Sequence, residues 1–378
     1  MPNDHCRATL VIGRLNRGGA ERVLAWLAGV LNERGWSVSL VLLGSADDPM
    51  AYALPDAVQI RHADIFWPSS GLGRVADLFR RIGTLRRTIL ATRPQVVISF
   101  IDGINLRVML ALLGSRIPIV VSERIDPRLH PKPRAFRLLR RILYPLASAV
   151  VIQTPALRPA WPAWWRNVRV IPNPIRRFDA SPLPDVPYRY LLTVARLDPQ
   201  KGCDLLIRAF LRISADTDVH LVLLGEGPER RRLTELTASL GLEARVHFLG
   251  ERQEVGAWLQ AAILFVLASH YEGQPNALAE AMAMGRPCIA TDTPGACSLI
   301  QSDRNGRLIP RGDETALANA MRILLDDDKL RLRLGQEAEA ITQTYVPERI
   351  ADQWEALLHA LIGKHPANEY TAEEEGQP

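Results

Sequence analysis

Cysteine is scarce in this sequence, and its spacing excludes two common uses of the residue. The chain of 378 residues has four cysteines, which lie far apart from one another: Cys6, Cys203, Cys288 and Cys297. Such scattered residues fit neither a disulfide framework nor a set of metal ligands. This usage predicts a reducing compartment.

The sequence also lacks an apolar run long enough to cross a membrane. The uncharged stretch at residues 142–157 is interrupted by Pro145 and Pro155, and it is shorter than the ~20 residues of a spanning helix. The first residues carry no basic segment followed by an apolar one, so we expect no signal peptide. We therefore expect a soluble cytoplasmic protein that could bind a membrane surface peripherally.

Acidic residues are scarce in the first half only. Residues 1–180 hold 26 Lys and Arg against 12 Asp and Glu, a net charge of +14, whereas the remainder holds 20 against 29, a net charge of −9. This excess of positive charge favours an anionic partner, such as nucleic acid, anionic lipid or a phosphorylated substrate. An ordinary arginine-rich, solvated surface is the alternative that charge alone leaves open.

What the sequence does have is a repeated alternation of apolar strands and amphipathic helices. With 47% hydrophobic residues, the chain is long enough for two domains of roughly 150 residues each. Residues 8–12 form an apolar strand, a glycine loop follows, and the leucines and valines of residues 23–31 recur at helical spacing. Repetition of this β-loop-α-β pattern predicts two doubly wound α/β domains.

A proline-rich segment at residues 181–189 separates the two halves and looks like a linker. We place the first domain at residues 1–180 and the second at residues 181–345. A C-terminal helix at 346–363 and a disordered acidic tail at 364–378 complete the expected organisation.

Two glutamates flank a tight turn in the second domain, in "HYEGQPNALAEAMAMG". Pro275 suits the first position of a helix and Gly285 suits its end, so Glu272 precedes the helix and Glu280 lies inside it. The helix N-terminus follows a strand and presents free N–H groups, which favour a phosphate or another anion. The neighbours of Glu280 are small and apolar, which argues against an ordinary solvated position. A carboxylate there can accept two sugar hydroxyls.

Two cations follow another strand of the same domain. Arg196 and Lys201, in "VARLDPQKG", can bind a pyrophosphate, the arginine as a fork and the lysine as a point charge. The sequence from Gly225 to Gly227 resembles part of a dinucleotide fingerprint, but the third glycine is missing and Pro228 intervenes. A nicotinamide site is therefore not expected.

These motifs occur together, in one order and at one spacing. The segments "VARLDPQKG", "LVLLGEGPER", "VHFLG", "EGQPNALAEAMAMGRP" and "NGRLIPRGD" resemble the C-terminal domain of retaining nucleotide-sugar glycosyltransferases of the GT-B fold, glycosyltransferase family 4. In the first half, "NRGGAERVLAWLAGVLNERGWSVSLVLL" and "VVISF…IPIVVSERIDP" are similar to the bacterial surface-polysaccharide members. The resemblance covers most of residues 8–345. It implies two Rossmann-like domains facing a cleft, the first for the acceptor and the second for the nucleotide sugar.

The resemblance also implies roles for individual residues. Arg196 and Lys201 would bind the donor diphosphate, Glu280 would bind the ribose, and Glu272 would lie against the donor sugar. We take Glu272 and the two cations as catalytic. The other donor-binding residues implied are Gly18, Gly19, Leu249, Gly250, Gly273, Gln274, Pro275 and Asn276. The acceptor side would include Glu21, Glu123 and Arg124 of the first domain.

Some of these assignments have alternatives in the sequence. Gly18 and Gly19 could form an ordinary turn between a strand and a helix. Gln274 stands where many relatives have a bulky apolar residue, which leaves the donor sugar open. The "SERIDP" loop departs from relatives that place a histidine there, and Glu123 or Arg124 would serve in its place.

The implied activity is transfer of a hexose or N-acetylhexosamine from a nucleotide diphosphate, expected to be UDP, with retention of configuration. The acceptor would be a lipid-linked or growing surface glycan. No metal or other cofactor is implied, because protein cations and the helix dipole take its place. The alternatives are a sugar-nucleotide epimerase of similar fold, an inactive scaffold and a nucleic-acid-binding protein. No nucleic-acid-binding motif accompanies the basic half, so we expect no nucleic acid partner.

Basic amphipathic segments in the first domain favour contact with an anionic membrane surface. Residues 74–93 and 133–146 carry apolar side chains on one face and arginines on the other, as helices lying on such membranes do. The alternative is that these apolar faces pack on the sheet. We expect a cytoplasmic protein that is peripheral on the inner face of the membrane.

Overall fold

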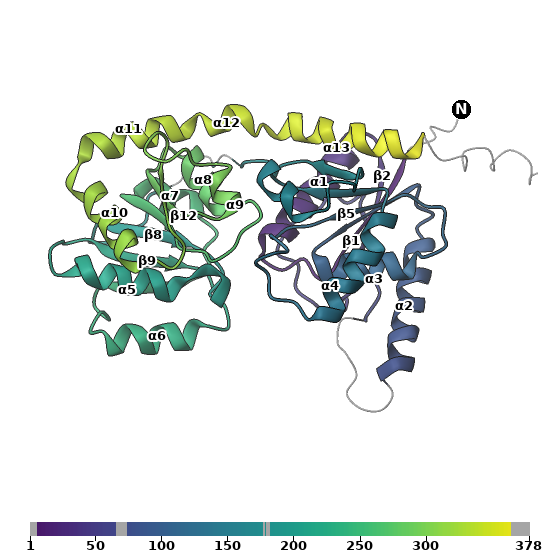
Figure 1. Ribbon diagram of the computed structural model, residues 1–378, viewed down its shortest axis with the longest axis horizontal. Coiled ribbons are helices and arrows are strands. Elements are labelled where there is room, and N and C mark those ends of the chain that lie inside the picture. The colour runs from purple at the N-terminus through teal and green to yellow at the C-terminus, as the bar shows by residue number, and fades with distance from the viewer. Residues whose placement is uncertain (1–5, 66–73, 177, 179–181, 364–378) are drawn as a thin grey trace, which may run out of the picture.

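The computed structural model describes residues 6–65, 74–176, 178 and 182–363, which form two α/β domains side by side (Figure 1). The first domain contains a parallel sheet of seven strands in the order β3-β2-β1-β4-β5-β6-β7. Its strands are β1 (Arg7–Ile12), β2 (Ser37–Leu42), β3 (Gln59–His62), β4 (Val96–Phe100), β5 (Ile119–Ser122), β6 (Ala149–Ile152) and β7 (Val168–Val170).

The second domain repeats this architecture with six parallel strands in the order β10-β9-β8-β11-β12-β13. Its strands are β8 (Tyr190–Val194), β9 (His220–Leu224), β10 (Val246–Gly250), β11 (Leu264–Leu267), β12 (Cys288–Thr291) and β13 (Arg307–Ile309). The strand order reverses between β8 and β11, and ligands of doubly wound sheets bind at the carboxyl ends of the strands at such a point.

Helices cover both faces of each sheet, because strands that are buried on two sides must pack against apolar surfaces. The first domain has α1 (Gly19–Glu33), α2 (Arg74–Leu90), α3 (Asp102–Ala111), α4 (Arg134–Leu143) and the 3-10 turns η1 (Tyr144–Leu146) and η2 (Pro155–Ala160). The second has η3 (Pro199–Lys201), α5 (Cys203–Ser214), α6 (Arg230–Ser239), α7 (Val255–Ala261), α8 (Asn276–Ala283), α9 (Pro294–Cys297), α10 (Glu314–Asp326), α11 (Asp328–Glu339) and α12 (Ile341–Thr344).

The last helix, α13 (Pro347–Ile362), returns to the first domain (Figure 1). Trp354 is fully buried in the same core as α1 and β1, and its ring stacks on Phe100 with the centroids 6.1 Å apart. At the edge of this core, Glu355 accepts hydrogen bonds from Arg34 at 2.8 Å and from the Trp36 ring nitrogen at 3.0 Å. The helix expected at 346–363 is therefore part of the first domain's core.

The prediction of two doubly wound α/β domains is confirmed. The proposed linker continues without regular structure through residues 182–189 to β8, while residue 181 and the acidic tail at 364–378 lie outside the described residues. Within the described part of the chain, each helix is too short or too polar to cross a membrane.

Candidate active site

The site begins with an ion pair between two loops of the second domain. Lys201 follows β8, and its Nζ donates to Glu272 Oε1 at 2.6 Å. The Ser269 hydroxyl, just after β11, donates to the same oxygen at 2.7 Å. Glu272 is only 6% exposed. Lys201 and Glu272, which were both expected at the donor site, therefore lie together at the carboxyl ends of adjacent strands.

A glycine allows the two loops to approach this closely. Gly202 adopts a left-handed conformation with φ +59°, and a Cβ at this position would lie 2.2 Å from the carbonyl oxygen of Ala268. Only a residue without a side chain fits both constraints. This contact places Lys201 directly beside the segment that carries Glu272.

Arg196 occupies the open side of the same corner. Its Nε donates to Asp198 at 2.7 Å, and its side chain is 68% exposed. In the first domain, burial raises the pKa of Glu21, while a backbone hydrogen bond and the positive charges of Arg196 and Arg124 oppose that rise. The charge of Arg196 therefore acts on the first domain as well as on its own loop.

The N-terminus of α8 meets the glycine loop of the first domain. No side chain caps this end of the helix, where Pro275 precedes Asn276. Asn276 Nδ2 donates to the carbonyl of Gly19 at 3.1 Å, and a Cβ on Gly19 would lie 2.9 Å from that nitrogen. The Glu21 carboxylate lies against Gly18, and a Cβ there would displace this side chain. The loop is thus more than an ordinary turn, because it packs against the free helix end.

The turn before α8 is docked on a residue that sequence reasoning missed. The backbone N–H of Asn173 donates to Gln274 Oε1 at 2.7 Å, and Asn173 Nδ2 donates to Asn276 Oδ1 at 2.7 Å. Gln274 is 7% exposed. A bulky apolar residue at position 274, as in many relatives, could not accept the hydrogen bond from Asn173. The glutamine that stands here instead therefore has a partner in the first domain.

Glu280 lies inside α8 and is 3% exposed, so a solvated position is excluded. Its Oε1 forms an ion pair with Arg22 of α1, across the interface between the domains. Burial raises the pKa of Glu280, and the charges of Arg22 and Arg176 oppose this rise. Arg22 was not among the expected site residues, although it follows Glu21 directly in the sequence.

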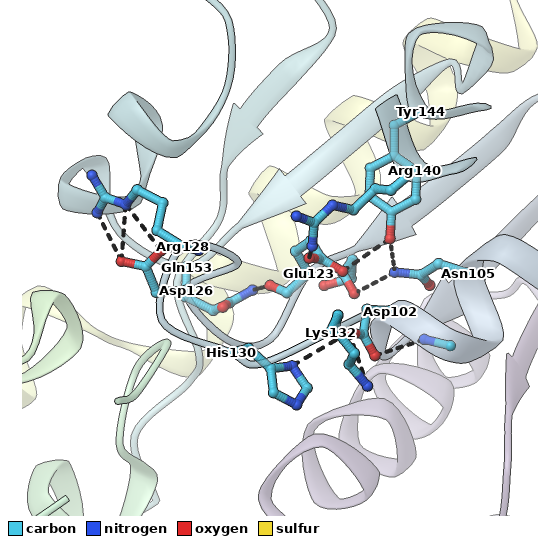
Figure 2. Close-up of polar contacts among 12 residues, drawn as sticks. Asp102, Asn105, Glu123, Asp126, Arg128, His130, Lys132, Arg140, Tyr144 and Gln153 are labelled. Atoms are coloured by element: carbon cyan, nitrogen blue, oxygen red, sulfur yellow. Dashed lines mark hydrogen bonds and ion pairs between the residues drawn. The ribbon is translucent and has the colours of Figure 1, made fainter. Parts of the chain in front are cut away.

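Glu123 and Arg124 occupy different surroundings on the acceptor side. Glu123 is 2% exposed, accepts from the Tyr144 hydroxyl at 2.9 Å and lies 3.5 Å from Arg140 (Figure 2). Burial raises its pKa to about 7. Glu123 therefore points into the first domain, whereas Arg124 donates to Asn173 Oδ1 at 2.6 Å at the domain interface.

The Arg124 backbone also fixes the turn before α8. A Cβ on Gly273 would lie 2.3 Å from the Arg124 carbonyl oxygen, so only glycine permits this contact. The guanidinium lies 4.5 Å over the Phe100 ring, and burial lowers its pKa to about 9. Arg124 thus links the "SERIDP" loop to the segment that carries Glu272.

Comparison with known proteins agrees with this geometry. A model of the glycosyl transferase 4-like domain matches residues 18–174, and the model described as glycosyl transferases group 1 matches residues 175–341. The chain is a glycosyltransferase. Together the two models span both domains of the enzyme, and the family expected from the sequence motifs is supported at this level.

One relative matches over nearly its whole length. It is the GalNAc-alpha-(1->4)-GalNAc-alpha-(1->3)-diNAcBac-PP-undecaprenol alpha-1,4-N-acetyl-D-galactosaminyltransferase of Campylobacter jejuni, 27% identical over 93% of this chain and 98% of the relative. Among solved structures, the sucrose-phosphate synthase from Thermosynechococcus elongatus has a TM-score of 0.81 at 20% identity, covering 95% of this chain and 100% of its own. Anabaena HepE in complex with UDP-glucose has a TM-score of 0.75 at 20% identity, covering 94% and 100%. The GT-B fold is thereby confirmed.

Leu249 and Gly250 lie at the end of β10, on the same edge of the sheet as the other donor residues. Gly250 has φ +71°, and its carbonyl accepts from the Gly225 N–H at 2.8 Å. The resemblance implies that the base of the nucleotide would lie against this turn. Its contact with a base remains a prediction.

The glycosyltransferase has a further polar cluster that sequence reasoning missed. The His130 ring stacks on Tyr271 of the second domain, with centroids 5.6 Å apart, and its Nδ1 lies 3.4 Å from Asp102 Oδ2 (Figure 2). Lys132 Nζ is 3.4 Å from the same oxygen. Asp102 directly follows β4 and Ile101, so its place after a strand was a signal that could have been used.

No three His, Cys, Asp or Glu side chains gather into a metal-ligand set within the described ranges. Activity without a metal stays a prediction. The comparisons favour neither an epimerase nor a nucleic-acid-binding protein, because both domain models and the relative named above are those of glycosyltransferases.

Proposed function

We propose that the enzyme transfers an N-acetylhexosamine from a UDP-sugar to a lipid-linked glycan, with retention of configuration. The observation that carries the proposal is the buried Lys201–Glu272 pair beside the uncapped N-terminus of α8. A diphosphate placed there would meet a lysine, the nearby Arg196 and the free N–H groups of the helix. The neighbouring Glu272 would lie against the sugar that the diphosphate carries.

Each of these residues would act on a charge that develops during transfer. As the bond between the anomeric carbon and the diphosphate oxygen breaks, its electron pair moves onto the diphosphate, which Lys201, Arg196 and the helix end stabilise. The Glu272 carboxylate stabilises the positive charge at the anomeric carbon. The acceptor oxygen bonds to that carbon on the face that the diphosphate leaves, and its proton passes to the departing diphosphate.

The relatives support the choice of donor and acceptor. The Campylobacter enzyme is named for transfer of N-acetylgalactosamine onto an undecaprenol diphosphate glycan, and it matches over nearly its full length. The Anabaena structure contains UDP-glucose. We infer a UDP-N-acetylhexosamine donor and an acceptor carried on a polyprenyl diphosphate.

A lipid acceptor requires access to a membrane surface, and the first domain has suitable side chains. On α4, Leu138 and Ile142 are 60% and 57% exposed, and Arg137 and Arg141 are exposed beside them. On α2, Phe79 is 72% exposed. Apolar side chains among arginines suit the interface of an anionic membrane. We infer peripheral binding through the first domain.

The apolar face of α2 divides between the two expected alternatives. Leu85 and Ile89, near its C-terminal end, are fully buried on the sheet, whereas Leu78 and Phe79 are exposed. The alternative of packing on the sheet therefore accounts for one end of the helix only. The other end projects beyond the domain (Figure 1).

The test is release of UDP from a panel of UDP-sugars by the purified enzyme, with and without an undecaprenyl-diphosphate-linked glycan. Release that depends on this acceptor, with an α-linked product by NMR, is expected. Lys201→Gln is the matched variant and should lose most of the release. Equal release without acceptor, or a product of inverted configuration, would contradict the proposal.

A further inference from the structure

Arg22 is the cation of the first domain that reaches the buried carboxylate of the second. It lies on α1, three residues after the Gly19 that packs against Asn276, and its Nη1 contacts Glu280 Oε1. The side chain of Arg22 is 27% exposed, whereas that of Glu280 is 4% exposed. The residues beside Glu280 on α8 are buried and apolar: Leu278, Ala279, Ala281 and Met282.

A carboxylate in such surroundings needs a positive charge to stay ionised. Burial raises the pKa of Glu280, and the largest opposing effect is the charge of Arg22, followed by Arg176 after β7. Tyr52, before β3, also faces the pair: burial and the negative charges of Glu21 and Glu280 raise its pKa. Of these groups, Arg22 alone makes a direct ion pair with Glu280.

The geometry leaves part of the carboxylate for a ligand. Arg22 contacts Oε1 as an ion pair without completing a hydrogen bond to it, and no hydrogen bond from the described residues reaches Oε2. A carboxylate has about four acceptor positions on its two oxygens. One guanidinium contact therefore still leaves room for the paired hydroxyls of a ribose.

We propose that Arg22 is a positioning residue for the donor: it holds and orients the Glu280 carboxylate, so that the free oxygen can accept the ribose hydroxyls of the nucleotide. The inference rests on the proposed nucleotide-sugar function. Its consequence is that the nucleotide site of the second domain is completed by α1 of the first. Binding of the nucleotide would then favour closure of the two domains.

The experiment is calorimetric titration of UDP into the full chain, with ADP and GDP as further probes, for Arg22→Gln, Glu280→Gln and the double variant. At neutral pH we expect each single variant to bind UDP about tenfold more weakly, the loss of one charge-assisted bond. The double variant should lose no more than about twofold beyond Glu280→Gln, because the two side chains act as one unit.

Two further measurements separate positioning from a general loss of structure. The deficit of Arg22→Gln should shrink as the pH is raised, because Glu280 then ionises without its cation. Arg22→Lys keeps the charge and should recover most of the affinity. Arg34→Gln is the matched control, since it removes the arginine that directly follows the same helix and pairs with Glu355 at 2.8 Å. It should bind UDP as the unmodified chain does.

The possible failures are distinguishable. If Arg22→Gln bound UDP as tightly as the unmodified chain, or more tightly, the ion pair would be inert or would compete with the ribose. Either result overturns this inference alone, as would fully additive losses in the double variant. If the unmodified chain bound none of the three nucleotides, the proposed function would fall and this inference with it.

Discussion

Glu123 makes the stability of the enzyme depend on pH, and the variant Glu123→Gln should remove that dependence. Burial raises the pKa of this side chain from 4.5 to about 7, and the charge of Asp102 adds to the rise. Between these two values the folded state binds a proton that the unfolded state has released. Stability from this group is therefore complete below about pH 4.5, and it is lost as the pH rises towards 7.

The size of the effect follows from the two pKa values. Each pKa unit corresponds to about 1.4 kcal/mol. Moving the pKa from 4.5 to about 7 thus lowers the free energy of unfolding by roughly 3 kcal/mol at alkaline pH, relative to acid. Glutamine keeps an oxygen for the Tyr144 hydroxyl and resembles the protonated acid; the charge of Arg140, which favours the ionised carboxylate, is already included in the raised pKa of Glu123.

The assay is urea unfolding of the unmodified chain and of Glu123→Gln at several pH values from about 5 to about 8. The stability of the variant relative to the unmodified chain should grow by roughly 2 to 3 kcal/mol over this range, because part of the effect already occurs below pH 5. Glu355→Gln is a control: burial raises the pKa of Glu355, but hydrogen bonds from Trp36 and Arg34 outweigh this and lower it below 4.5. Its contribution to stability is therefore lost only in more acidic solution, and the difference between Glu355→Gln and the unmodified chain should stay nearly constant over this range. A constant difference between Glu123→Gln and the unmodified chain would refute the buried, proton-binding role.

Three further results are expected. Glu272→Gln should lower kcat by about 100-fold and leave UDP affinity nearly unchanged, because the amide oxygen still accepts from Lys201 while the charge at the anomeric carbon is lost; a loss of UDP binding alone would contradict this. Chelation of divalent ions should leave steady-state turnover unchanged, since Lys201 and Arg196 would supply the positive charge; restoration of lost activity by a metal would contradict it. Flotation with anionic vesicles should be salt-sensitive and weaker in Leu138→Ser/Ile142→Ser; equal binding to neutral vesicles at high salt would contradict it.

Lys201 and Glu272 could be brought together from the sequence because both follow apolar strands. The carboxyl ends of parallel strands meet at one edge of a sheet, so residues 71 positions apart were expected in one place, and they form a hydrogen bond. The burial of Glu280 could also be predicted from the sequence. Small apolar neighbours on both sides identified a helix face that packs inwards.

The sequence carries no comparable signal for the contacts between the two domains. Asn173 lies 101 positions from Gln274, in a segment without periodicity, and nothing local indicates that its backbone N–H will meet a side-chain oxygen. Glu123 is another case. It was expected towards the acceptor because many relatives have a histidine in this loop, but the side chain turns back to Tyr144. The direction of a side chain depends on the packing around it, and the strand pattern alone does not determine that packing.

The return of α13 has a consequence for how the two halves cooperate. Because Trp354 and Leu358 are buried in the first domain's core, the chain crosses between the domains twice, once near residue 180 and once before Pro347. Two crossings restrict sliding of one domain over the other more than they restrict opening about an axis near both. Such a hinge would separate Arg22 from Glu280 and Gly19 from Asn276 in one movement. The residues proposed to face the donor would then be assembled together when the two domains close, so the proposed donor site depends on both domains.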